Sequence, residues 1–211
     1  MAEAREDTRS GRKRRAIVTA ATTLFLEHGY QGTSMDDVAA RAAVSKQTVY
    51  KHFADKERLF TEIVLGTLDR AGDPFRTRIE KLADTADLAG DLRDLAREYL
   101  ATVMQPPVLQ LRRLVISEAA RLPGLASAYY ERAPERTIDA LAACFGRLAG
   151  RGLLRPADPT LTASHFAFLV LGRALDKSLF HAGAGTFTAA ELASLADAGA
   201  DAFLRAYQAD S

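Results

Sequence analysis

Apolar residues recur along most of the chain at intervals of three and four, the spacing that places side chains on one face of an α-helix. The first such segment covers residues 10–28, and Gly29 and Gly32 come directly after it. Glycine commonly ends helices because it adopts the left-handed backbone conformation at low cost. The sequence therefore predicts a helix over residues 10–28, whose inward positions are Ile17, Ala20, Ala21, Leu24 and Phe25.

Residues 33–60 predict two short helices joined by a turn and followed at once by a third helix. Thr33 and Ser34 are good N-caps, and the acids at positions 36 and 37 favour a helix start. Residues 43–45 form the predicted turn, in which Ser45 caps the second helix, beginning at Lys46. The apolar positions of these two helices are Met35, Val38, Ala39 and Ala42 in the first, and Val49 and Phe53 in the second.

The second short helix buries only a narrow stripe, so its polar side chains face outward. A slim helix of this kind fits a DNA major groove about 12 Å wide, where Lys46 and Gln47 can pair with base edges. The hydroxyls of Thr48 and Tyr50 suit phosphate oxygens better. Asp55 caps the next helix, and a lysine in its first turn can hold a phosphate. The sequence predicts DNA contacts by Thr33, Ser34, Ser45, Lys46, Gln47, Thr48, Tyr50, Lys51, His52 and Lys56. The alternatives are solvated charge for Lys51 and packing or capping for His52.

The run from about residue 12 to 60, with its loop at 29–34 and the segment 44–53, resembles the N-terminal domain of TetR/AcrR-type transcriptional regulators. The resemblance implies that residues 46–53 form a recognition helix and that Ser34, Thr48, Tyr50 and Lys56 touch the DNA backbone. Ala43 stands where family members often carry glycine. An L-residue with positive φ costs roughly 1 kcal/mol or more, so this turn is either slightly strained or built without a left-handed residue.

Downstream of residue 56 the chain predicts further helices punctuated by proline and glycine. The helix starting at Lys56 is expected to be the only covalent link between the DNA-binding module and the rest of the chain. It is expected to break near 72–74, because proline disfavours a helical residue before it. The other predicted helices cover 88–104, 108–122, a segment beginning at Pro134 and ending near 152, 160–181 and 188–208. The predicted fold is all-α: a DNA-binding domain with a helix-turn-helix and basic arm (1–55), then a larger helical ligand-binding and dimerisation domain (56–211).

The helix over 160–181 is apolar around most of its circumference, so it must be covered on more than one side. Two such helices from each of two chains would form a four-helix bundle about a two-fold axis, which is also how the family is usually assembled. A dimer would place two recognition helices about 34 Å apart and predicts a roughly palindromic operator. The predicted dimer residues are Phe166, Val170, Leu175, Leu192, Leu195, Gly199, Ala202 and Phe203.

The middle helices carry aromatic and polar side chains within apolar surroundings, and in TetR-like regulators this region commonly encloses an inducer pocket. A few polar groups in an apolar cavity orient a ligand, although most of these residues would also serve as ordinary core. Residues 111–123 and 129–132 resemble the ligand domain of the AefR-like subgroup. The predicted effector contacts are Tyr99, Met104, Leu114, Glu118, Tyr129, Tyr130, Phe145, His165 and Phe168.

Charge is distributed unevenly, although the 211 residues carry a net charge of only +1. Residues 1–60 contain 11 Lys/Arg against 8 Asp/Glu, whereas residues 61–211 contain 17 against 19. Half of the positive charge in the first segment lies at Arg5, Arg9 and positions 12–15. This arm could reach the DNA backbone or an adjacent minor groove, or be a solvated tail.

Other classes of function lack their residue patterns. The four histidines show no zinc-ligand spacing, and the chain contains neither a phosphate-binding glycine loop nor a Gly-x-Ser-x-Gly elbow. We therefore expect no enzyme, metal or cofactor. The single cysteine, Cys144, is expected to be a buried small hydrophobe, with a redox switch as the alternative. The longest hydrophobic run, 166–171, is far shorter than the roughly 20 residues that cross a bilayer, so a cytoplasmic protein is expected.

Overall fold

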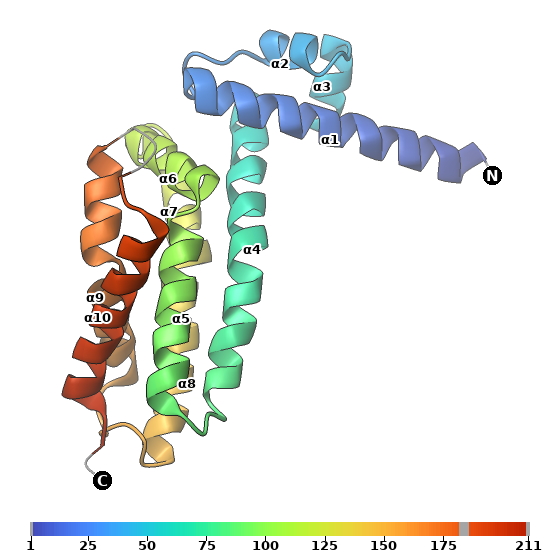
Figure 1. Ribbon diagram of the computed structural model, residues 1–211. Coiled ribbons are helices and arrows are strands. Elements are labelled where there is room, and N and C mark those ends of the chain that lie inside the picture. Colours follow the sequence, from blue (N-terminus) through green and yellow to red (C-terminus); the bar gives the residue numbers. More distant parts are fainter. Residues whose placement is uncertain (1, 182–185, 210–211) are drawn as a thin grey trace. The chain divides into compact units, whose positions relative to one another are not determined.

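The computed structural model describes residues 2–181 and 186–209, which form helices joined by short turns (Figure 1). An isolated antiparallel bridge joins Leu154 to Gln208. The all-α prediction is confirmed. The elements are α1 (Ala2–His28), α2 (Met35–Arg41), α3 (Lys46–His52), α4 (Lys56–Leu82), α5 (Leu88–Val103), α6 (Pro106–Glu118), α7 (Pro123–Tyr130), the π-helix η1 (Glu131–Glu135), α8 (Arg136–Gly150), α9 (Pro159–Phe180) and α10 (Ala189–Tyr207).

The chain divides into two compact units. The first comprises Met1–Thr67 together with Gln110–Ser127, and the second comprises Leu68–Leu109 together with Ala128–Ser211. The first unit thus extends beyond the domain boundary expected at residue 55. It takes up the beginning of α4 and most of α6, so α4 is not its only connection to the remaining chain.

The core of the first unit lies where α1, α2, α3 and the start of α4 meet. Every predicted inward position of α1 is buried, as are Met35, Val38 and Ala39 of α2 and Val49 of α3. The rings of Phe25, Tyr30 and Phe60 cluster at centroid distances of 4.8 to 5.9 Å. Phe53 is buried as well, so the predicted apolar faces of the two short helices are confirmed except at Ala42, the C-cap of α2, which is only partly buried.

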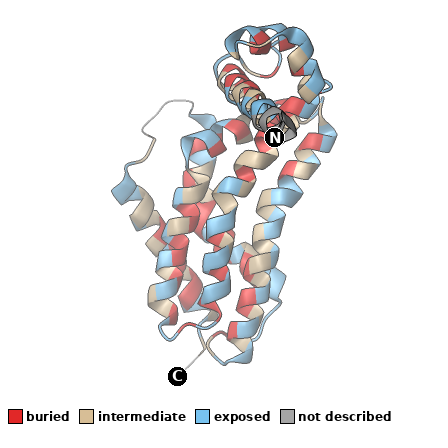
Figure 2. Cartoon of the chain, turned by 90° about the vertical axis from the view of Figure 1, so that its right-hand side faces the viewer, coloured by how far each residue is buried: buried red, intermediate tan, exposed pale blue. Residues whose placement is uncertain are grey.

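The core of the second unit lies among α5, α8, α9 and α10, which run side by side in Figure 1. Buried and exposed positions alternate along these helices, as the amphipathic spacing requires (Figure 2). Phe145, Phe166 and Phe203 form an aromatic cluster, with ring centroids 5.0 to 5.5 Å apart. Cys144 is buried, as expected, and burial raises the pKa of its thiol to about 11.

Several helix boundaries differ from the sequence-based expectation: α1 begins at Ala2 rather than at 10, and α6 ends at Glu118 rather than at 122. Three further differences lie at prolines. α4 continues through Pro74, because burial of Phe75 and Ile79 beyond it outweighs the lost backbone hydrogen bond. α6 begins at Pro106 rather than at 108, since the first turn needs no N–H donor. Pro134 lies inside η1, where a wider helical turn accommodates the missing donor.

Candidate DNA-binding surface

The two short helices are positioned by side-chain caps that the sequence predicted. Ser34 caps α2 in a reciprocal capping box: its Oγ accepts from the Asp37 backbone N–H at 3.1 Å, and the Asp37 carboxylate accepts from the Ser34 N–H at 3.1 Å. This hydrogen bonding lowers the pKa of Asp37. Ser45 caps α3, its Oγ lying 3.2 Å from the Thr48 backbone nitrogen. The caps fix where both helices begin.

The turn between α2 and α3 adopts the strained form of the two alternatives. Ala43 has a φ of 51°, in the left-handed region. Among the described residues it is the only one other than glycine with positive φ. The backbone nitrogens of Ala43 and Val44 still bond to the α2 carbonyls of Ala40 and Ala39, at 3.2 and 3.1 Å. The turn therefore keeps its hydrogen bonds and bears the cost of a Cβ in this conformation.

The solvent-facing side of α3 forms a polar depression of about 470 Å³, lined by Gln47, Thr48, Tyr50 and Lys51. Tyr50 is 44% exposed, unusual for so large an apolar ring. The opposite side of α3 is anchored by Val49, which is fully buried. The structure thus brings together four of the predicted DNA-contact residues on one open helix face, of the width that a major groove accepts.

Two other predicted contact residues serve the protein's own loop. Thr33 is 2% exposed, and its hydroxyl donates to the Gly29 carbonyl at 2.9 Å. Lys56 Nζ donates to the carbonyls of Tyr30 and Thr33 at 2.9 and 3.0 Å, and lies 4.3 Å from the Tyr30 ring centroid. Both residues hold the loop between α1 and α2 in place. Only the remaining ammonium proton of Lys56 can point to a phosphate.

Lys46 and His52, at the two ends of α3, have different surroundings. Lys46 Nζ pairs with the Asp36 carboxylate of α2 at 2.8 Å, which raises the pKa of the lysine. His52 is partly buried, and burial lowers its pKa. The nearby cations of Arg14, Lys51 and Lys13 lower it further. Lys46 is therefore already paired with a carboxylate in the free protein, and His52 lies in a positive environment.

The predicted effector residues occupy several different settings. Tyr99 stacks on Phe75 at 4.7 Å and Phe145 lies in the core, whereas Tyr130 and Phe168 are 60% and 76% exposed. His165 is exposed and hydrogen-bonds to Tyr207. Tyr129 is buried and Met104 partly buried in the second unit, while Leu114 and Glu118 belong to the first. Glu118 Oε2 accepts from Gln31 Nε2 at 2.9 Å.

The predicted dimer residues divide into an inner and an outer set. Phe166, Val170, Gly199 and Phe203 pack inside the chain's own second unit, and a Cβ at Gly199 would lie 2.7 Å from a carbonyl oxygen of α9. Leu175, Leu192, Leu195 and Ala202 are partly exposed. The large exposed apolar side chains of α9, which the sequence pattern did not single out as a set, are Leu161, Phe168, Leu169 and Phe180.

Comparison with known proteins finds two family models that match the chain. Residues 17–63 match the family model described as bacterial regulatory proteins of the tetR family. Residues 90–209 match the C-terminal domain of AefR-like transcriptional repressors. A crystal structure of a TetR-family regulator from Mesorhizobium loti is 43% identical, covers 95% of this chain and 98% of its own, and has a TM-score of 0.87.

Two further relatives are also transcriptional regulators. The flavonoid-responsive regulator FrrA is 33% identical, with 95% of this chain and 100% of that chain covered and a TM-score of 0.72. The Bacillus subtilis (strain 168) transcriptional regulator YhgD is 30% identical over 159 residues, 72% of this chain and 76% of its own length.

The fold and the surface define a helix-turn-helix transcriptional regulator rather than an enzyme. The chain belongs to the TetR family, and its C-terminal domain is of the AefR-like kind. Within the described ranges, no helix is long and apolar enough to cross a membrane.

Proposed function

We propose that the chain is a homodimeric repressor that binds a roughly palindromic operator and is released from it by a small molecule. The observation that carries the proposal is the open polar face of α3, which presents Gln47, Thr48, Tyr50 and Lys51 on a helix whose start is capped. A helix that only supported the fold would not need four outward hydrogen-bonding side chains around a depression.

The dimer is supported by the exposed apolar side chains of α9. Leu161, Phe168, Leu169 and Phe180 are between 46% and 82% exposed. Leaving such side chains in water is unfavourable, by about 25 cal/mol for each Å² of apolar surface. A second copy that packs its own α9 and α10 here would cover them by two-fold symmetry.

DNA selection from a random-sequence pool tests the DNA-reading part of the proposal. The tightest duplex should show two-fold symmetry with half-sites one helical turn, about 34 Å, or a multiple of it apart. Tyr50→Ala should weaken binding to all duplexes alike, whereas Gln47→Ala should change the preferred base at defined positions. An asymmetric selected site would contradict the symmetric dimer.

Release by an effector is supported by the AefR-like C-terminal domain and by the relative FrrA, which is described as flavonoid-responsive. A compound that binds the native state raises the melting temperature by mass action. We expect a thermal-shift screen of small apolar and amphipathic molecules to find binders that also weaken binding to the selected duplex. Binders that leave DNA affinity unchanged would contradict release, because only differential affinity for two states shifts an equilibrium.

A further inference from the structure

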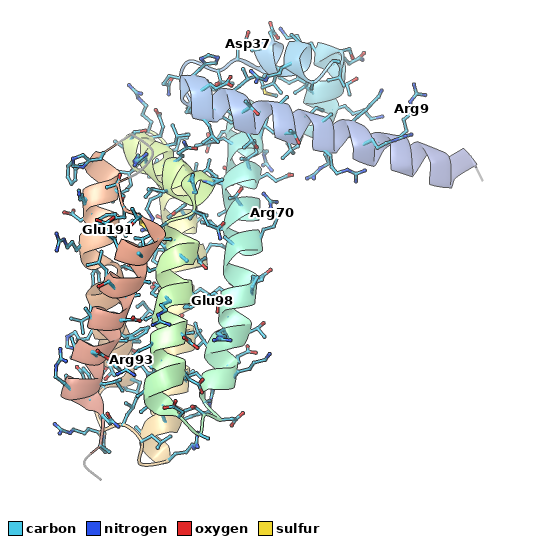
Figure 3. All side chains as sticks on the ribbon, in the orientation of Figure 1. Arg9, Asp37, Arg70, Arg93, Glu98 and Glu191 are labelled. Carbon is cyan, nitrogen blue, oxygen red and sulfur yellow. The ribbon has the colours of Figure 1, made fainter. Side chains whose placement is uncertain are left out.

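Helix α1 extends well beyond the part that packs into the core. Its first buried residue is Ile17, so more than two helical turns precede it within the described side chains. Residues 9–15 carry five cations in seven positions, at Arg9 and 12–15. In Figure 3, Arg9 projects from the N-terminal part of α1. The side chain of Arg5 lies outside the described residues. The basic arm is therefore a helix from Arg9 onward, with no buried side chain before Ile17.

This extension approaches the C-terminal end of α3. Arg14 forms an ion pair with Glu62 of α4, and its guanidinium lies 5.3 Å from the ring centroid of Phe53, the residue after α3. Lys13, next to Arg14, acts electrostatically on His52 together with Lys51. We call Lys13, Arg14, Lys51 and His52 the basic corner. Its three full positive charges exceed the one negative charge that Glu62 contributes.

The basic corner adjoins the proposed reading face, because Lys51 belongs to both. A positive surface beside a helix that enters a major groove meets the phosphates bordering that groove. Clustered cations with little compensating charge repel one another in the free protein. Backbone phosphates would relieve this repulsion.

We infer that Lys13 and Lys51 hold a DNA backbone phosphate at the basic corner, and that Arg9 and Arg12 continue the contact along the duplex flanking the half-site. The inference rests on the proposed DNA-binding function and adds a site on α1 to it. Arg14 acts as the positioning residue, because its contacts with Glu62 and Phe53 hold α1 against α4 and the residue that follows α3.

Salt dependence of binding tests the inference, since each phosphate contact contributes about 0.9 to the slope of log K against log salt. The probe is the selected duplex, extended by about ten base pairs, one helical turn, on each side. Lys13→Ala should reduce the slope by about 0.9 for each protomer bound and leave base preference unchanged. For each contact removed, raising the salt from about 50 to 200 mM should weaken DNA binding of the wild type about 3.5-fold more than that of the variant.

Matched variants separate a contact from a general effect of charge. Lys13→Arg should restore the slope, and Lys81→Ala, which removes an exposed charge from the second unit, should not change it. The double variant Arg9→Ala/Arg12→Ala should lower the slope on the extended duplex but not on one trimmed to the half-sites.

The outcomes distinguish the inference from the function on which it rests. A wild type that binds no duplex in the selection would overturn the proposed function itself. Specific binding by the wild type, with slopes unchanged in Lys13→Ala and in the double variant, would overturn the inference alone. Equal slope changes in Lys13→Ala and Lys81→Ala would also overturn it, because they would show a net-charge effect.

Discussion

The hydrogen bond between Gln31 and Glu118 joins the loop after α1 to the end of α6, and its removal should cost measurable stability. Glu118 is 7% exposed although it carries a carboxylate, and its Oε2 lies 2.9 Å from Gln31 Nε2. Arg121, one turn further, lies 3.6 Å from the same oxygen but is largely exposed. Gln31 is thus the donor that compensates the burial of this carboxylate.

A hydrogen bond to a charged group contributes about 1.5–3 kcal/mol to stability. Because Gln31 is itself exposed and solvent can replace part of its contribution, we expect the pairwise term to be about 1–1.5 kcal/mol. Glu118→Ala and Gln31→Ala should each lower the free energy of unfolding by that amount or more. The double variant should then lose about 1–1.5 kcal/mol less than the sum of the two single losses.

The assay is urea unfolding followed by circular dichroism, at one fixed protein concentration because dimerisation contributes to apparent stability. Glu118→Gln is the control, since it retains an acceptor oxygen without the charge and should lose less than the alanine variant. A coupling energy below about 0.3 kcal/mol, the level at which independent sites add, would refute the assigned role of this bond.

Four further predictions concern single residues. Gly199→Ala should destabilise the protein by about 1–3 kcal/mol in thermal unfolding, because the added Cβ would lie 2.7 Å from a backbone oxygen of α9. Gly150→Ala is the control and should not destabilise the protein, since nothing lies within 4 Å of the added Cβ. Ala43→Gly should stabilise by about 0.5–1 kcal/mol, since glycine accepts a φ of 51°; a lower melting temperature would contradict this. Asp36→Asn should strengthen binding to the selected duplex by freeing its partner lysine, and unchanged affinity would show that the ion pair does not compete. The pKa of His52 in the folded protein lies below 6.5, so as the pH falls the unfolded chain protonates this histidine first. The melting temperature of the wild type should therefore fall from about pH 6.5 downward. The melting temperature of His52→Gln should fall less over the same range.

The helix-turn-helix could be predicted in detail because its determinants are local. Caps at Ser34 and Ser45 act within three residues of themselves, and the apolar faces follow from the helical period. The roles of Thr33 and Lys56 could not be predicted in this way. Their partners are loop carbonyls that come within reach only after the chain has folded. For Lys56, these bonds would compete with the phosphate contact that the family resemblance implies.

The apolar helix α9 shows a different limit of sequence reasoning. Because it is apolar around most of its circumference, periodicity alone does not tell which face packs inside the chain and which faces outward. Phe166 and Val170 were predicted at a dimer interface and lie in the chain's own core, whereas Phe168 and Leu169 are exposed. The distinction depends on α10, whose Gly199 lets the two helices approach.

The division of the chain bears on how an effector signal could reach α3. α4, α6 and α7 each begin in one unit and end in the other, so a change in the second unit has three covalent routes to the first. The end of the α6 route passes through the pair of Gln31 and Glu118. A bond contributing about 1 kcal/mol can transmit a coupling of at most about that size, equivalent to roughly fivefold in DNA affinity. If an effector weakens DNA binding by much more than this, and Glu118→Ala leaves the effect intact, the signal must pass mainly by a route other than this bond, along α4 or α7.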